Sequence, residues 1–206
     1  GTQALVKSYQ CPSDDPNATI PTSLGGMVDF YGPGDDCGGS FNKPNMCIDY
    51  IYDLPVSYPA MAARQPGGTN YIPCAGGLGA YTGRANDAYR LYPGIYYPNS
   101  KVKLTEISDG TSNTLAFGET VGGYTTDGQK NFHQSWMGAS GMAVAWGLPS
   151  NFKDARWYMY SSKHAGGLVQ FAFGDGSVKG VRSSISSGTY RALGGRSDGY
   201  VLNQDY

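Results

Sequence analysis

Two short apolar runs near the C-terminus form the clearest hydrophobic pattern of the chain. Residues 168–173 (LVQFAF) and 178–181 (VKGV) flank the tetrapeptide Gly174-Asp175-Gly176-Ser177. An Asp-Gly pair between two apolar runs favours the positive φ angles of a tight β-turn. The pattern therefore predicts a β-hairpin over residues 168–181.

Weaker patterns are spread along the rest of the chain. They are a helical turn at 102–107, a capped turn at 109–113, a strand at 114–119, three short strands at 134–137, 143–146 and 157–160, and a helix at 187–193. Gly194-Gly195 follows that helix and is a typical helix stop. Residues 4–9 are either a last helical turn or a short strand.

The first half of the chain lacks a regular pattern. Between residues 17 and 98 the sequence is interrupted by Gly-Gly and Pro-Gly steps, with only short apolar pieces between them. Such a stretch buries too little apolar surface to become ordered by packing alone. We therefore predict a loop-rich half over residues 1–100 and a sheet framework over residues 101–206, both within a single domain.

The composition favours short strands over long helices. The chain has 31 Gly, 12 Pro and 17 Tyr, which disfavour helices and suit strands joined by irregular loops. The expected fold class is α+β, mostly β. Charged residues make up 15% and the net charge is −1, with both signs scattered. The sequence therefore offers no basic surface for a nucleic acid or an anionic membrane.

Four cysteines fall within the first 74 residues, at Cys11, Cys37, Cys47 and Cys74. None is spaced as Cys-x-x-Cys, so the pattern favours disulfides over a zinc or redox motif. Of the three connectivities, we favour Cys37 with Cys47 and Cys11 with Cys74. Paired thiols would place the protein in an oxidising compartment outside the cytoplasm.

A hydrolase site is one interpretation of His164, Asp175 and Ser161 or Ser162. However, the sequence contains no Gly-x-Ser-x-Gly motif for a nucleophilic serine, and the hairpin turn already explains Asp175. We predict no catalytic residue. His164 is instead expected to cap or hydrogen-bond the loop before the hairpin.

Metal ligands are also sparse in the sequence. His133 and His164 are the only histidines, so a histidine-based metal site would need carboxylate ligands as well. Calcium stays open as an alternative, because Asp14-Asp15 and Asp35-Asp36 provide the oxygen ligands that it prefers. No EF-hand loop accompanies them, and our prediction is no cofactor and no metal-ligand set, with calcium as the alternative.

Four stretches of the chain resemble a large pilin-like family, domain of unknown function 1559, whose C-terminal signature is His, nine residues, then Asp-Gly. They are a Cys-Pro-Ser-Asp block at residues 11–14, the segment Asp109, Gly110, Thr111, Ser112, Asn113 and Thr114, the signature His164, Asp175 and Gly176, and a closing segment at residues 185–199. Ten residues separate His164 from Asp175. The additional residue predicts a bulge in the first hairpin strand or a longer approach to it.

The resemblance implies a non-enzymatic structural subunit of a filament like a type IV pilus or the pseudopilus of type II secretion. The chain would be the antiparallel-sheet head with long Gly-rich loops, and the N-terminal apolar helix of such subunits is absent from it. Partners would be other pilin or pseudopilin subunits, with membrane contact only through that helix. The location would be the periplasm, cell envelope or cell surface. Removal of the helix should leave an apolar patch on the sheet.

A second hypothesis is a surface-displayed module that binds a polysaccharide or a partner protein. It rests on aromatic residues of the loops, which could stack on a ligand. These residues are Tyr92, Tyr96, Tyr97, Trp136, Trp146 and Trp157.

Overall fold

The structure is a computed structural model that describes residues 4–17, 25–26, 28–31, 47–50, 67–79, 91–97, 100–136 and 141–202, with side chains outside 25–50. Strands dominate among these residues, together with one α-helix and several short 3-10 turns. The fold is therefore α+β and mostly β, as predicted. None of the described helices has the length and apolarity needed to cross a membrane.

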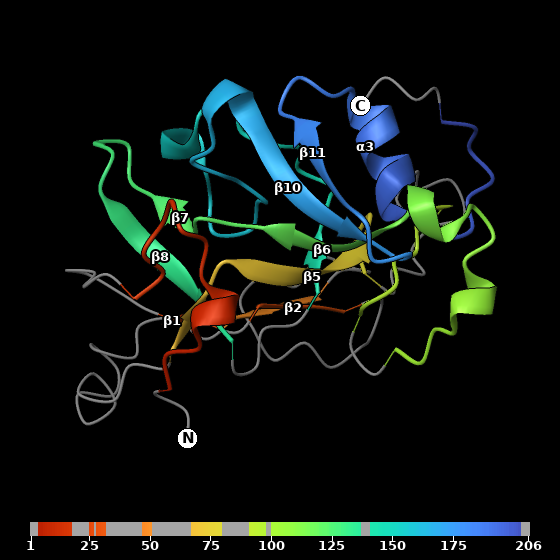
Figure 1. The fold of residues 1–206 in the computed structure, drawn as a ribbon, viewed down its shortest axis with the longest axis horizontal. Coiled ribbons are helices and arrows are strands. Elements are labelled where there is room, and N and C mark those ends of the chain that lie inside the picture. Colours follow the sequence, from red (N-terminus) through yellow and green to blue (C-terminus); the bar gives the residue numbers. More distant parts are fainter. Residues whose placement is uncertain are drawn as a thin grey trace.

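A five-stranded sheet forms the framework, with β10, β6 and β5 crossing the molecule side by side (Figure 1). Its strands, in spatial order, are β11 (Val178–Arg182), β10 (Leu168–Phe173), β6 (Leu115–Glu119), β5 (Tyr71–Gly76) and β9 (Met142–Ala143). All neighbours are antiparallel except β5 and β9. The predicted hairpin is confirmed: β10 and β11 pair without interruption, and Gly176 adopts φ +83° in the turn.

Smaller sheets and turns surround this framework. β8 (Lys130–Ser135) pairs with β1 (Gly25–Gly26), β4 (Gly68–Thr69) and β7 (Gly123–Tyr124), and β2 (Val28–Tyr31) pairs with β3 (Cys47–Tyr50). The 3-10 turns are η1 (Lys7–Tyr9), η3 (Leu104–Glu106), η4 (Thr111–Asn113), η5 (Phe152–Asp154) and η6 (Ala165–Gly167).

The core lies on one face of the framework sheet, which we call the inner face. Side chains alternate along a strand, so Val169, Phe171 and Phe173 of β10 all point to this face and are buried. The helix α3 (Ser187–Gly194) packs against them through Tyr190 and Leu193. The opposite, outer face of the sheet is left without a covering helix among the described residues (Figure 1).

Several predicted elements are correct and others are not. The turns at 102–107 and 109–113, the strand at 114–119 and the helix at 187–193 are present as η3, η4, β6 and α3. Residues 157–160 form turns instead of a strand, the strand predicted at 134–137 begins at Lys130, and that at 143–146 is limited to Met142–Ala143. Residues 4–9 contain the 3-10 turn η1 and no strand.

The prediction of an irregular region from residue 17 to 98 missed β5, which lies inside the framework sheet. Pro73 in the middle of this strand argues against a central position, because proline donates no ladder hydrogen bond. β5 tolerates it because Tyr71–Pro73 pairs only with β6, and β9 begins pairing at Cys74.

The predicted bulge is absent from the hairpin itself. Register is continuous from Leu168↔Arg182 to Ala172↔Val178. The irregularity instead separates β10 from β6, where Ala172 pairs with Phe117 and Phe173 pairs with Leu115. The turn η6 lies between His164 and β10, and the other expectation, a longer approach to the strand, stays a prediction.

Candidate functional site

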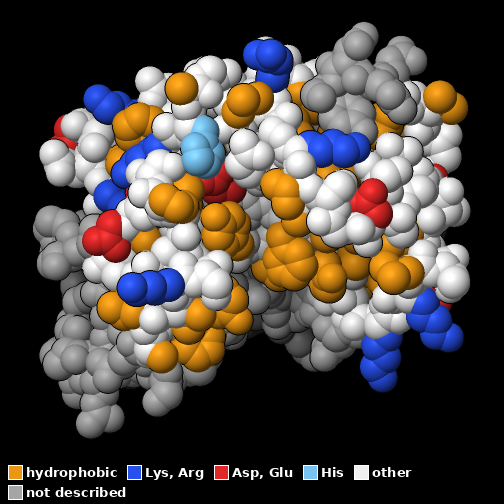
Figure 2. Space-filling view, in the orientation of Figure 1, with side chains coloured by type: hydrophobic (Ala, Val, Ile, Leu, Met, Phe, Trp, Pro, Cys, Tyr) orange, Lys and Arg blue, Asp and Glu red, His pale blue; other side chains and the backbone are white. Residues whose placement is uncertain are grey.

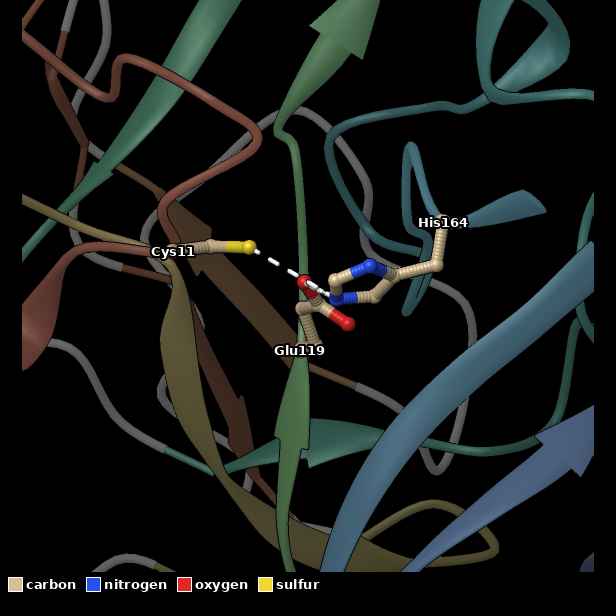
Figure 3. Close-up of side chains that lie close together, drawn as sticks. All are labelled: Cys11, Glu119 and His164. Carbon is tan, nitrogen blue, oxygen red and sulfur yellow. Dashed lines mark hydrogen bonds and ion pairs between the residues drawn. The ribbon is translucent and has the colours of Figure 1, made fainter.

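Three side chains from distant parts of the sequence converge at one end of the outer sheet face (Figure 3). Cys11 follows η1, Glu119 is the last residue of β6, and His164 precedes η6. His164 Nε2 lies 3.8 Å from Cys11 Sγ and 3.2 Å from Glu119 Oε1. Cys11 and Glu119 are buried, whereas the His164 side chain is 37% exposed. We call these residues the Cys-Glu-His cluster.

Hydrogen bonds to neighbouring strands fix the position of Cys11 and Glu119. The Cys11 backbone N–H donates to Asn70 Oδ1 at 2.8 Å, and the Asn70 amide donates to the Thr120 carbonyl at 2.9 Å. The Gln170 backbone N–H donates to Glu119 Oε2 at 3.3 Å. The cluster therefore joins the N-terminal segment to β6 and β10.

A buried carboxylate next to the cluster anchors the same N-terminal segment. Asp14 is 1% exposed at its side chain and lies 2.7 Å from Lys130 Nζ and 2.6 Å from Lys163 Nζ. Burial alone would raise the pKa of the Asp14 carboxyl, but Lys130 and Lys163 hold it below its usual value. Burial lowers the pKa of Lys130, whereas Asp14 outweighs burial at Lys163 and raises its pKa. Through these two ion pairs, the buried Asp14 carboxylate links β8 to the loop that carries His164.

The cluster thiol is in an environment that disfavours the thiolate. Burial raises the pKa of Cys11, and the neighbouring Glu119 raises it further, against a lowering contribution from Ser13. Reactive cysteines have lowered pKa values and electropositive surroundings. The environment of Cys11 is the opposite of the one that activates a nucleophile.

With Cys11 as the nucleophile, the orientation of the imidazole ring does not match a catalytic triad. In a triad one ring nitrogen faces the nucleophile and the other faces the orienting acid. Here Cys11 and Glu119 both approach His164 Nε2, while Nδ1 lies 3.4 Å from Ser13 Oγ. In a Ser13-His164-Glu119 relay, Nδ1 would face the serine and Nε2 would face the acid, whereas in the serine-protease triad Nε2 faces the serine and Nδ1 faces the acid.

The hydrolase residues considered in the sequence do not come together. Asp175 is exposed in the hairpin turn and accepts hydrogen bonds from the Ser177 backbone and hydroxyl, which lower its pKa. Ser161 Oγ accepts a hydrogen bond from the Val121 backbone N–H, and Ser162 Oγ accepts one from the His164 backbone N–H. The expectation that His164 caps the following turn is wrong, because its side chain makes no cap bond there and points to the cluster instead.

The Asp-Gly-Thr-Ser-Asn-Thr segment has a structural role. Asp109 accepts hydrogen bonds from the backbone N–H groups of Asp198 at 2.6 Å and Gly199 at 3.1 Å. The Thr111 carbonyl accepts from the Asp175 N–H at 3.1 Å. The segment therefore holds both the hairpin turn and the closing segment in place.

Replacing Asp198 by Asn is expected to raise the thermal midpoint at about pH 8 and to change it much less at about pH 4. Burial, together with the neighbouring Asp109 carboxyl, raises the pKa of Asp198 to about 6. The stability that the neutral form contributes is present below the unfolded pKa and is lost as pH rises through the folded pKa. Thermal melts of both proteins at the two pH values measure this, and a midpoint difference independent of pH would contradict it.

The predicted pairing of Cys11 with Cys74 is wrong, because both residues are buried free thiols. Cys74 packs in the core between β6 and β9, where burial raises its pKa to about 11, while Cys11 faces Glu119 and His164. Cys37 and the side chain of Cys47 lie outside the described residues.

Asp14 does not provide the open oxygen site expected for calcium, because two lysines already occupy its carboxylate. Asp35 and Asp36 lie outside the described residues. His133 is buried away from the cluster, and burial lowers its pKa to about 4.

Sequence reasoning found two members of the cluster separately and missed Glu119 and Ser13. The sequence pattern assigns Cys11 to a disulfide and relates His164 to Asp175 or His133, and it does not link Cys11 with His164. A signal was available, since Cys11, Ser13 and His164 lie within the stretches that resemble the pilin-like family, and Glu119 ends the strand that follows the Asp109 segment. Their proximity depends on the pairing of β5 with β6, which the sequence pattern did not reveal.

Comparisons with known proteins place the chain in a family but supply no characterised relative. No curated protein and no solved structure matches it. A family model described as "Protein of unknown function (DUF1559)" matches residues 1–188, a range that includes the Cys-Glu-His cluster, the Asp109 segment and the hairpin. The chain therefore belongs to the DUF1559 family.

Proposed function

We propose that the chain is the non-enzymatic head of a pilin-like filament subunit, exported to the cell envelope or cell surface, whose outer sheet face receives an apolar helix. The subunit would pack with other pilin or pseudopilin subunits through that helix. The observation that carries the proposal is an apolar groove on the outer face of the framework sheet.

The groove is lined by side chains from four strands of the sheet and has a volume of about 520 Å³. Hydrophobic side chains gather on this face around a hollow in the surface (Figure 2). Phe117 of β6 is 38% exposed, Tyr71 of β5 is 37% exposed and Val178 beside β10 is 66% exposed. A cluster of large exposed apolar residues on a sheet face is typical of a surface that binds another element.

The N-terminal segment borders the same groove. Ser8 and Tyr9 line it, and the Tyr9 carbonyl accepts a hydrogen bond from the Asn70 N–H at 2.8 Å. Trp136 Nε1 donates to the Ala4 carbonyl at 2.9 Å, which holds the start of this segment at the groove's edge. A helix joined to the chain before Ala4 would therefore need only a short connection to lie in the groove.

The non-enzymatic part of the proposal rests on the chemistry of the cluster. Cys11 has a raised pKa, and its sulfur shares one imidazole nitrogen with Glu119. Neither feature favours nucleophilic catalysis.

The alternative of a sugar- or protein-binding platform has less support. Trp157 packs against Phe132 and Tyr158, and Trp146 packs against Tyr158, so these rings belong to a small core. Rings engaged in packing are not free to stack on a ligand. The Tyr96 ring packs against Phe117, with 5.0 Å between ring centroids.

The variant Phe117→Glu is expected to reduce incorporation of the subunit into filaments by about thirtyfold. Burial of a phenylalanine contributes about 2 kcal/mol, and each 1.4 kcal/mol is about tenfold in an equilibrium. The measurement is quantitative immunoblotting of sheared filaments from cells that express the subunit with the residues encoded upstream of Gly1.

Leu104→Glu is the matched control, because Leu104 is 66% exposed and lies outside the groove. It should assemble like the unchanged subunit. Equal incorporation of both variants would contradict the proposal, as would an upstream coding region without a prepilin leader and apolar helix.

A further inference from the structure

We propose that Cys11, Glu119 and His164 bind one divalent ion of the zinc class. This site is independent of the filament role, because it depends only on groups within the head. The ion would join the N-terminal segment, the end of β6 and the turn before β10.

Two distances within the cluster, sulfur to nitrogen and nitrogen to oxygen, fit a tetrahedral zinc site. Zinc takes sulfur at about 2.3 Å and nitrogen or oxygen at about 2.0–2.2 Å, so tetrahedral angles separate sulfur from nitrogen by about 3.6 Å and nitrogen from oxygen by about 3.4 Å. The corresponding distances are 3.8 Å from Cys11 Sγ to His164 Nε2 and 3.2 Å from His164 Nε2 to Glu119 Oε1. All three ligand atoms lie within 4.8 Å of one another.

A second observation points to a cation between these atoms. Glu119 is 1% exposed, and its Oε1 lacks a hydrogen bond of good geometry; the groups beside the carboxylate are the Cys11 thiol and His164 Nε2. Its contact with His164 Nε2 at 3.2 Å is an ion-pair contact without hydrogen-bond geometry. A buried carboxylate oxygen without a well-formed hydrogen bond is costly, and coordination to an ion would satisfy it.

The surrounding groups match the outer shell of a metal site. A ligating histidine usually engages a polar group through its other ring nitrogen, and a ligating carboxylate is itself hydrogen-bonded. His164 Nδ1 lies 3.4 Å from Ser13 Oγ, and Glu119 Oε2 accepts from the Gln170 N–H at 3.3 Å. Both ligands are therefore oriented by neighbours that leave Nε2 and Oε1 for the ion.

The donor set also indicates the kind of ion. Thiolate, imidazole and carboxylate together suit zinc and related transition metals, whereas calcium and magnesium prefer oxygen ligands. Binding would replace the S–H bond of Cys11 by a sulfur–metal bond and release that proton to solvent. The exposed side of His164 leaves the fourth coordination position to water.

Titration with Co²⁺ tests the proposal, because thiolate coordination to Co²⁺ produces a charge-transfer absorption. The 206-residue head, reduced and treated with a chelator, should bind one Co²⁺ with this absorption, and one Zn²⁺ should displace it. Cys11→Ser should lose the absorption, and Glu119→Gln and His164→Asn should bind far more weakly. Ser13→Ala, which removes only the neighbour of Nδ1, should weaken binding by about tenfold.

Asp175→Asn and Cys74→Ala are the matched controls, since they remove a carboxylate and a thiol outside the cluster. Both should bind the ion like the unchanged head. A folded head that gives no thiolate absorption with Co²⁺ would overturn the proposal, and so would an absorption that survives Cys11→Ser. Far-UV circular dichroism identifies variants that remain folded, and Ser13→Ala provides the test if a ligand variant does not fold.

Discussion

Replacing Asp14 by Asn is expected to lower the free energy of unfolding by about 3 kcal/mol at neutral pH. The Asp14 carboxylate is almost completely buried and contacts both Lys130 and Lys163. Asparagine keeps the shape but removes the charge, so the two ammonium groups would face each other without a counter-charge. Removing one member of a buried ion network costs far more than losing a surface pair.

The pH dependence of this effect follows from the lowered pKa of Asp14. The stabilisation is present above the unfolded pKa, about 3.9, and is lost as pH falls through the lower folded value. Urea unfolding at about pH 7 and about pH 3 should therefore show a difference between the two proteins that shrinks in acid.

Asp15→Asn is the matched control for Asp14, because the Asp15 side chain is exposed and accepts from the Asn17 N–H, while the Asp15 backbone carbonyl, which accepts from Lys130 Nζ, is unchanged by the substitution. Its cost should stay below about 1 kcal/mol. An equally small cost for Asp14→Asn at neutral pH would contradict the role of Asp14 as an anchor.

Replacing Phe171 by Ala is expected to cost about 4 kcal/mol of unfolding free energy. Phe171 is 1% exposed, and its ring packs against Tyr160 at 5.1 Å and Tyr190 at 6.0 Å between ring centroids. Gly118 lies against the same rings, and a side chain there would collide with Phe171 and Tyr160. Such close packing leaves a cavity that the surroundings cannot fill when the ring is removed.

Phe117 provides the comparison, because it is the same residue type on the opposite face of the sheet. It is 38% exposed, so Phe117→Ala should cost about 1 kcal/mol or less in the isolated head. Denaturant unfolding of both variants measures this difference between the faces. Similar costs would show that the outer face is packed like the core, contrary to the groove described above.

The local parts of the fold were predictable from the sequence, whereas the contacts between distant segments were not. The hairpin has an Asp-Gly turn between two apolar runs, and α3 has Ser186 as its N-cap and glycines at its end. The residues that give these signals are adjacent in the sequence to the elements they define, so both elements can be predicted without the tertiary structure.

β5 and the Cys-Glu-His cluster depend on contacts across the fold. β5 contains Pro73 and follows a Gly-rich stretch, so its local pattern resembles a loop, and only pairing with β6 makes it a strand. Cys11 and His164 are separated by 153 positions in the sequence. Each residue has an ordinary local explanation, and the shared site appears only when β6 brings Glu119 between them.

Nuclear Overhauser contacts from the Phe117 ring and the Val178 methyl groups test the central claim most directly. The sample is the subunit with the residues encoded upstream of Gly1, in detergent micelles. We expect contacts from both side chains to an upstream apolar helix, together with loss of their exposure to a paramagnetic solvent probe. Phe117 and Val178 that remain as exposed as in the isolated head, without contacts to any helix, would contradict the assignment of the outer face as a helix-binding groove.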